Sequence, residues 1–288
     1  MSRSTFIGLI LGGLVFASAL LLGHVPLRTM INPEALVIVL GGTITATTLA
    51  FPFPTILAAF NGLRKSSPES QISIEDTTHY VMDIVRFVRD EGILALQPLL
   101  AQIELPFLRK GLGLLMDNRS ESFVRDNLTT ELEVIYRQNL DYAKVFETAG
   151  GFSPTMGIIG AIIGLIHVME SAHDPGKLGQ GVANAFSATL YGVAVSNLFF
   201  LPVAAMLRHR ARTDWFIKTL ILESIMRLRA GEHPMMIEER LMAFSARPDQ
   251  DSLTAEAAAS YMTPPPRRPQ QVLPVQPQGP QLEEALFE

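Results

Sequence analysis

Two apolar stretches of this chain carry prolines at positions where a membrane helix would be interrupted. The first stretch is Thr148–Met169 and holds Pro154, and the second is Leu178–Leu207 and holds Pro202. Proline has no N–H, so inside a helix it leaves the carbonyl four residues earlier without its usual donor. The pattern predicts a kink at each proline and a free carbonyl before it.

The freed carbonyls should be those of Gly150 and Leu198. Inside a membrane such groups need another partner, often water or a Ser or Thr hydroxyl. Nearby residues offer such hydroxyls, namely Ser153, Thr155, Ser187 and Thr189. We therefore expect a polar seam between the two helices.

Neither stretch contains a carboxylate, although a path for protons or cations normally includes an ionisable group within the membrane. Two explanations follow from the residues alone. Either the seam transports nothing, or the titrating group comes from another polypeptide. The residue pattern leaves both explanations open.

Glycines give the first stretch a surface that another helix can approach closely. Gly150, Gly157 and Gly164 fall seven residues apart, and Gly160 with Gly164 makes a small-xxx-small pair. Packing within this one chain is the simplest interpretation of that surface.

The remaining composition excludes several classes of protein. Glycine-rich nucleotide loops, nucleophile elbows and metal-ligand spacings are missing from the sequence, so we expect no enzyme activity, cofactor or metal site. There is no cysteine for disulfides, and the net charge of −5 provides no basic footprint for nucleic acid.

Charge distribution predicts the elements that position these residues. Four windows of at least 20 residues lack Asp, Glu, Lys and Arg, namely Ser4–Gly23, Ala35–Leu63, Thr148–Met169 and Leu178–Leu207. Each is long enough to cross a hydrocarbon core of about 30 Å. The first could be a signal peptide cleaved after Ala17-Ser18-Ala19, but its apolar run continues beyond that point, so we expect a retained helix. The predicted fold is an all-α polytopic membrane protein with four transmembrane helices and a helical cytoplasmic domain.

Basic residues orient these helices. With the N-terminus inside, 21 of the 23 lysines and arginines fall on the cytoplasmic side, so both termini should be cytoplasmic. Helical stripes of apolar residues in the long loop and after the fourth window, the latter stopped by Gly231 and Pro234, indicate a packed cytoplasmic domain. The expected segments are a helix pair (4–63), a helical loop domain (64–147), the ion-path helices (148–207), a helical extension (208–245) and a disordered Pro-rich tail (246–288).

The segment Ala149–Leu207 resembles the flagellar stator subunits MotA and PomA. The resemblance is carried by the runs Gly151–Leu165, Phe186–Gly192 and Asn197–Pro202. It extends to Gly231–Glu239, to the early Gly41-Gly42-Thr43 and to Arg89–Leu96, which is nearly the whole chain up to Phe244. The Pro-rich tail lies outside the match.

This resemblance implies a machine of two kinds of subunit in the bacterial cytoplasmic (inner) membrane. MotA-like subunits form a ring around a dimer of MotB-like partners, each with one membrane helix that carries an essential Asp. Ions would pass between that helix and the third and fourth helices of this chain. Titration of the Asp would turn the ring, which drives the rotor protein FliG. The expected partners are therefore a MotB-like subunit, FliG, further copies of this chain and membrane lipid, with no nucleic acid.

The resemblance also implies roles for individual residues. The expected ion path includes Pro154, Thr155, Ala161, Thr189 and Pro202. Arg89 matches the loop arginine that meets the rotor, but Gln97 stands where the family usually has an acidic residue. Rotor contact could then depend on Arg86, Glu91 or Glu104.

Ion choice and family branch also follow from the resemblance. Sodium-using relatives tend to have a hydroxyl at the position of Ala161, and alanine offers no oxygen to a dehydrated cation, so we expect H⁺ rather than Na⁺. A TolQ/ExbB-type motor subunit is the nearest alternative, but such proteins typically have three spans and begin outside. A structural scaffold would explain the glycines but not Pro154, Thr189 and Pro202 together.

Overall fold

The computed structural model describes residues 32–64, 74–170 and 175–245, together with six isolated positions before residue 32. Throughout these ranges the chain is helical and contains no strand, which agrees with the all-α prediction. The first charge-free window, apart from isolated positions, and the tail 246–288 lie outside the described residues.

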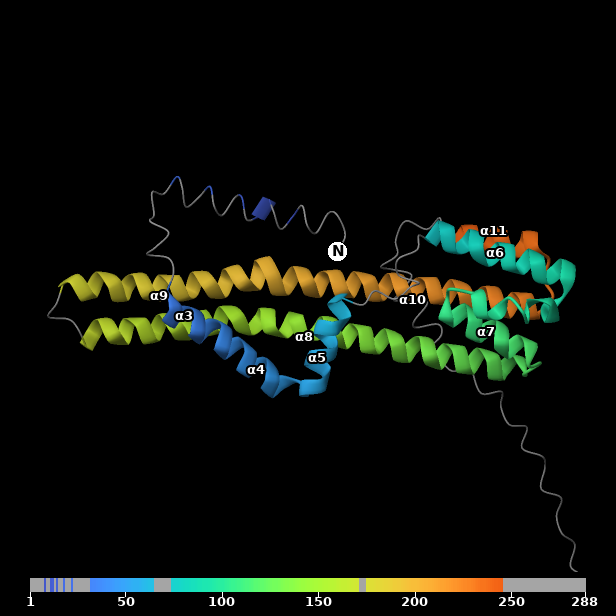
Figure 1. Ribbon diagram of the computed structural model, residues 1–288. Coiled ribbons are helices and arrows are strands. Elements are labelled where there is room, and N and C mark those ends of the chain that lie inside the picture. Colours follow the sequence, from blue (N-terminus) through green and yellow to red (C-terminus); the bar gives the residue numbers. More distant parts are fainter. Residues whose placement is uncertain are drawn as a thin grey trace, which may run out of the picture. The chain divides into compact units, whose positions relative to one another are not determined.

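Two long antiparallel helices organise the described chain (Figure 1). The first is α8 (Glu121–Glu170), and the second runs through α9 (Pro175–Val195), the π-helical η5 (Ser196–Phe200) and α10 (Leu201–Arg229). At 1.5 Å per residue the 50 residues of α8 extend about 75 Å, more than twice the thickness of a hydrocarbon core. The boundaries expected at 147 and 207 therefore fall inside continuous helices.

Three helical stretches in the described ranges are long and apolar enough to cross a membrane. They are Pro33–Ala50, Glu121–Met169 and Gly181–Arg229. The chain is accordingly a helical membrane protein, and three of its four predicted spans correspond to described helices.

The window Ala35–Leu63 contains a break that the charge pattern did not indicate. Its first part is α3 (Pro33–Leu36), the π-helical η1 (Val37–Gly41) and α4 (Gly42–Ala50), and a separate α5 (Phe53–Arg64) follows. Phe51 between them is extended, with φ −133° and ψ 146°. The residue before a proline is disfavoured in the helical region, and Pro52 follows Phe51. The membrane-length helix therefore ends at Ala50.

Helix α5 packs on α8 through small and aromatic side chains. Ala59 is fully buried in a cluster with Ala143 and Phe146 of α8 and with Leu207 of α10. The Phe60 and Phe146 rings meet edge to face with centroids 5.1 Å apart. Because α5 also exposes Phe53, Leu57 and Phe60, it keeps an apolar face that the described residues leave uncovered.

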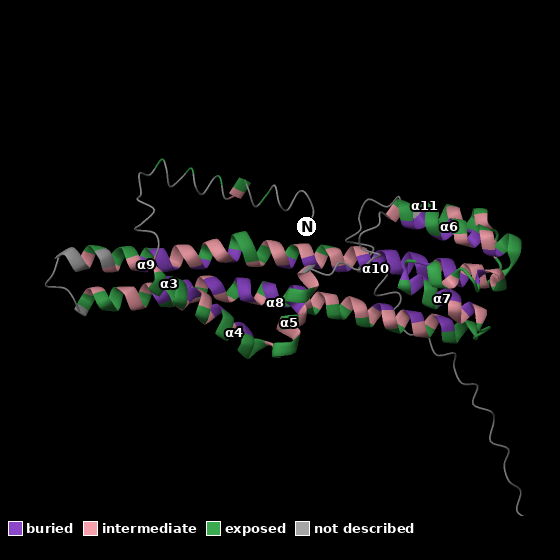
Figure 2. Ribbon diagram, in the orientation of Figure 1, coloured by how far each residue is buried: buried purple, intermediate pink, exposed green. Residues whose placement is uncertain are grey.

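The helices α6 (Ile74–Glu91), α7 (Pro106–Met116) and α11 (Pro234–Ser245) pack on α10. Between α6 and α7 lie two 3₁₀ turns, η3 (Ile93–Leu96) and η4 (Leu100–Gln102). Figure 2 shows the buried residues concentrated along this part of α10, where Ile217, Leu220, Ile221 and Ile225 are at most 1% exposed. The apolar stripe and the helix end before Gly231, whose φ is +73°, are both as predicted.

One ion pair is enclosed in this packed region. Lys218 Nζ donates to Asp214 Oδ2 at 2.5 Å within α10, and the two side chains are 5% and 4% exposed. The neighbouring Trp215 ring lies 5.9 Å from the ring of Tyr136 on α8. Burial of both charges makes each dependent on the other, since an unpaired charge in this position would be costly.

Candidate functional site

The contact between α8 and α9 is built from residues without bulky side chains. A Cβ added to Gly157 would lie 3.0 Å from the Ala188 carbonyl oxygen, and one added to Gly164 would lie 3.1 Å from the Ala185 nitrogen. For Gly160 the nearest atom would be Ala188 Cβ, at 2.8 Å. These three predicted packing glycines therefore face α9, and the helix backbones approach closely because the side chains are missing.

Gly150 has a different neighbour. A Cβ there would meet the side chains of Leu201 and Phe200, with Leu201 Cδ2 at 2.8 Å. The glycine with the closest backbone neighbours in this contact is one that we did not predict. A Cβ on Gly192 of α9 would lie 2.6 Å from the Ser153 carbonyl oxygen and 3.2 Å from Pro154 Cα. Both are backbone atoms, so only glycine fits here without movement of a helix.

Pro154 lies inside α8, and the carbonyl that it frees has a partner on the other helix. Ser196 Oγ donates to the Gly150 carbonyl oxygen at 2.7 Å. In the opposite direction, Ser153 Oγ donates to the Gly192 carbonyl oxygen at 3.0 Å. Ser153 and Ser196 are 0% and 2% exposed, so both bonds are shielded.

The hydroxyls expected to serve the freed carbonyls bond elsewhere. Thr155 Oγ1 donates to the Phe152 carbonyl at 2.7 Å, Ser187 Oγ to Ala183 at 2.9 Å and Thr189 Oγ1 to Ala185 at 3.4 Å. Each of these bonds stays within its own helix. Ser196 was not among the predicted hydroxyls because a bond between antiparallel helices depends on their relative register. The sequence of neither stretch specifies that register.

Pro202 has a local setting unlike that of Pro154. The five π-helical residues of η5 precede it directly, so Pro202 lies just after a π-helical turn inside the continuous run of α9, η5 and α10. π-Helical turns inside α-helices are uncommon and frequently mark functional sites.

The expected ion-path residues keep their side chains partly or fully exposed beside this buried contact. Pro154 and Ala161 share a face of α8 with Ile158 and Leu165, which are 54% and 48% exposed. Thr189 shares a face of α9 with Val182, Phe186 and Val193, which are also exposed. Thr155 is exposed as well, and Pro202 is partly exposed. The described part of the chain therefore leaves these residues accessible to another helix.

Electrostatically these faces are neutral. No Asp, Glu, Lys or Arg occurs in the stretches 148–169 and 178–207. Among the described residues, no group of three His, Cys, Asp or Glu side chains is arranged to hold a metal ion. A titrating carboxylate for this seam would therefore have to be supplied by a partner.

The predicted rotor-contact residues are all exposed, in and after α6. Arg86 Nη2 pairs with Glu238 Oε2 of α11 at 2.7 Å, and Arg89 Nη1 donates to the Gly231 carbonyl oxygen at 3.5 Å. The structure thus brings these two arginines to the turn between α10 and α11. Glu91, Gln97 and Glu104 follow along the exposed surface from the end of α6 to the start of α7.

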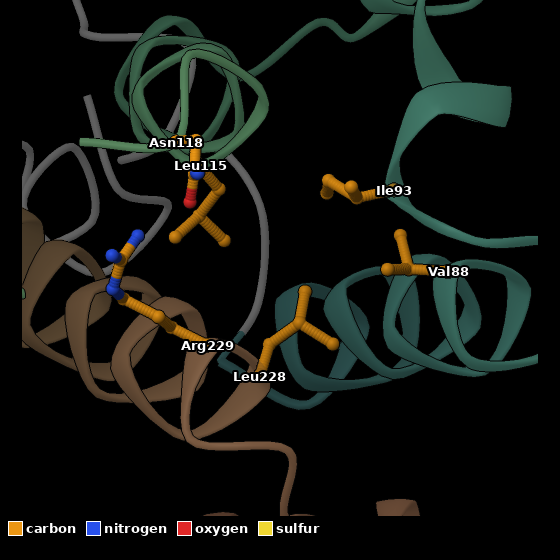
Figure 3. Close-up of a pocket in the computed structure, with 6 residues that line it drawn as sticks. All are labelled: Val88, Ile93, Leu115, Asn118, Leu228 and Arg229. Carbon is orange, nitrogen blue, oxygen red and sulfur yellow. The ribbon is translucent and has the colours of Figure 1, made fainter. Parts of the chain in front are cut away.

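A pocket of about 290 Å³ opens next to this surface (Figure 3). Figure 3 shows Val88 and Ile93 on one side of it and Asn118 and Arg229 on the other. Leu115 and Leu228 complete its lining. Since Val88 precedes Arg89 directly, the pocket adjoins the predicted rotor-contact residues.

Comparison with known proteins agrees with this geometry. Residues 100–215 match the model of the MotA/TolQ/ExbB proton channel family. The chain is 29% identical to motility protein A of Bacillus subtilis over 251 residues, which cover 87% of this chain and 93% of that protein. It is 30% identical to motility protein A of Borreliella burgdorferi over 175 residues, covering 61% and 67% of the two chains.

The fold is also similar to that of a solved assembly. A chain of the flagellar MotAB stator complex from Bacillus subtilis superposes with a TM-score of 0.77 at 29% identity, covering 88% of this chain and 99% of that chain. The similarity extends over nearly the whole length of Bacillus subtilis motility protein A and of the solved stator chain. This chain therefore belongs to the MotA/TolQ/ExbB proton channel family, among its motility protein A members.

Proposed function

We propose that this chain is a flagellar motor stator subunit that forms an ion channel with a MotB-like partner and converts ion flow into torque on the rotor. The observation that carries the proposal is the α8–α9 seam. It positions Pro154 and Thr189 beside exposed helix faces, yet it contributes no carboxylate. A seam of this kind requires a second polypeptide that brings the titrating group.

The partner that fits is a single membrane helix with an intramembrane Asp. Its carboxylate would titrate near Pro154, Thr155, Ala161, Thr189 and Pro202. Ala161 adds no oxygen to coordinate a dehydrated cation, so we expect the transported ion to be H⁺ rather than Na⁺. No resident cofactor, metal or catalytic step is required, because the energy comes from the ion gradient.

We further propose four transmembrane helices in the bacterial cytoplasmic membrane, with both termini in the cytoplasm. Support comes from the distribution of basic residues, of which 21 of 23 fall on the cytoplasmic side in this orientation. The window Ser4–Gly23 would be the first of the four spans, in addition to the three described helices of membrane length. In this orientation α5 follows the second span on the cytoplasmic side, and its exposed Phe53, Leu57 and Phe60 would contact lipid.

Several copies of this chain would surround the partner as a ring, and the cytoplasmic helices would contact the rotor protein FliG. The exposed positions of Arg86, Arg89, Glu91, Gln97 and Glu104 support that surface as the contact. Since Gln97 carries no charge, Arg86, Arg89 and the two glutamates would provide its electrostatic part. The segments 64–147 and 208–245 would act together as the torque-delivering domain.

A TolQ/ExbB-type role in energising an outer-membrane process is less well supported. The family model covers both branches, but the relatives matched over nearly their full length are motility proteins. The additional N-terminal apolar window also fits a stator better than a three-span subunit.

The test is complementation of a flagellated host that lacks its own stators and supplies the matching partner. The wild-type chain should restore swimming, whereas Pro154→Ala and Pro202→Ala should not. Pro106→Ala is the matched control, because Pro106 begins α7 in the cytoplasmic part and its loss should leave swimming intact. Failure of the wild-type chain to restore motility, with both proteins present in the membrane, would reject the proposed function.

A further inference from the structure

Two serines connect α8 and α9 in opposite directions at the level of Pro154. Ser153 of α8 donates to the carbonyl of Gly192 on α9, and Ser196, the first residue of η5, donates to the carbonyl of Gly150 on α8. The donors and acceptors are 39 and 46 residues apart in sequence. The two bonds are therefore tertiary contacts, unlike those of the neighbouring threonines.

Both bonds depend on the close approach of the two backbones. Gly192 allows this approach, since any Cβ there would lie 2.6 Å from the Ser153 carbonyl oxygen. A slip of one residue would rotate each serine by about 100° around its helix and remove both hydroxyls from their acceptors. The pair thus holds one register and disfavours its neighbours.

The bond from Ser196 has a second effect, because its acceptor is the carbonyl that Pro154 frees. A free carbonyl beside an ion path attracts water or a cation. With Ser196 bonded to it at 2.7 Å, the Gly150 oxygen is directed at the other helix and is occupied. Pro154 can therefore interrupt the hydrogen bonding of α8 without leaving an exposed ligand.

We propose that Ser153 and Ser196 are positioning residues of the motor. They hold α8 and the helix formed by α9 and η5, the proposed third and fourth spans, in register beside Pro154. The two spans then move as one body when the partner's carboxylate gains or loses its proton. Neither hydroxyl touches the ion, and both act through the helices that present Pro154 and Thr189. This inference rests on the proposed function and adds to it the residues that couple the two ion-path helices.

The test uses the full chain with its partner in a host without stators, and it measures torque on a bead attached to one flagellum. As stator units join a motor, the torque rises in steps. Step height reports the torque of one unit, and the number of steps reports how many units assemble. A variant that is merely unstable changes the number of steps and leaves their height unchanged.

Ser196→Ala should reduce the step height at least about twofold, because an unsatisfied buried carbonyl shifts the equilibrium between helix arrangements by roughly tenfold. Ser153→Ala should act in the same direction, and Ser196→Thr, which keeps the hydroxyl, should recover most of the height. Ser187→Ala is the matched control, since that buried hydroxyl on α9 bonds only within its own helix.

The outcomes separate the two proposals. Wild-type step height for both Ser196→Ala and Ser153→Ala, whatever the number of steps, would overturn the positioning role while leaving the stator function intact. Equal losses for Ser196→Ala and Ser196→Thr would also overturn it, because the hydroxyl would then be irrelevant. A wild-type chain that gives no steps at all rejects the stator function itself.

Discussion

Replacement of Gly192 by alanine tests whether the close contact of α8 and α9 is essential. The added Cβ would lie 2.6 Å from the Ser153 carbonyl oxygen, whereas ordinary contact begins at 3.4 Å, so the helices must separate by about 0.8 Å. That movement stretches the 3.0 Å bond between Ser153 Oγ and the Gly192 oxygen to about 3.8 Å, beyond hydrogen-bonding distance. Overpacking costs about 1–3 kcal/mol and a lost buried bond about 1 kcal/mol. We expect a loss of about 3 kcal/mol in total.

The assay is thermal unfolding of the purified stator complex in detergent, with torque measured in parallel. For a chain of this size, a loss of about 3 kcal/mol corresponds to a fall of about 6–12 °C in the apparent midpoint. Gly179→Ala is the control, because that glycine is also on α9 and a Cβ there would have no neighbour within 4 Å. A midpoint for Gly192→Ala equal to that of wild type, or equal falls for both variants, would refute the steric reasoning.

Three further predictions concern charge and ion choice. Lys218→Ala should lower the free energy of unfolding in detergent by about 3–5 kcal/mol, because it leaves the buried Asp214 carboxylate unpaired. Lys218→Met combined with Asp214→Leu should recover most of that loss, since no buried charge remains. No recovery in the double variant would contradict the desolvation argument. Arg86→Ala should change the unfolding free energy by less than about 1 kcal/mol, since its pair with Glu238 is about half exposed on the arginine side, so a larger loss would mean that the pair is structural. If the channel carries H⁺ as proposed, swimming should stop on addition of a protonophore and continue when external sodium is replaced by potassium. A speed that follows sodium would show that the proton assignment is wrong.

Much of the fold follows from local patterns in the sequence. Three of the charge-free windows correspond to described apolar helices, because charged side chains are expensive in a bilayer. Three of the four predicted glycines pack against α9, since their spacing places them on one helix face. The end of α10 before Gly231 was predictable from glycine's tolerance of positive φ.

Other features depend on information that no single segment carries. The charge pattern marks which residues avoid water but not where helices end, so it could not show that α8 continues from the loop domain into the membrane. The helix break at Phe51 follows from Pro52, but a window defined only by the absence of charged residues does not reveal it. Ser196 and Gly192 acquire their roles from the register of two helices, and only the assembled pair displays it.

The continuity of α8 has a mechanical consequence. Between Pro154 and Glu121 the helix has 33 residues, or about 50 Å, without an intervening loop. A helix packed against α10 and α5 is stiff, so it can transmit a displacement from one end to the other. A small tilt produced at Pro154 would reach the Glu121 end of the helix as a larger lateral displacement. Little of the displacement that accompanies ion passage would then be lost to bending of the subunit before it reaches the rotor.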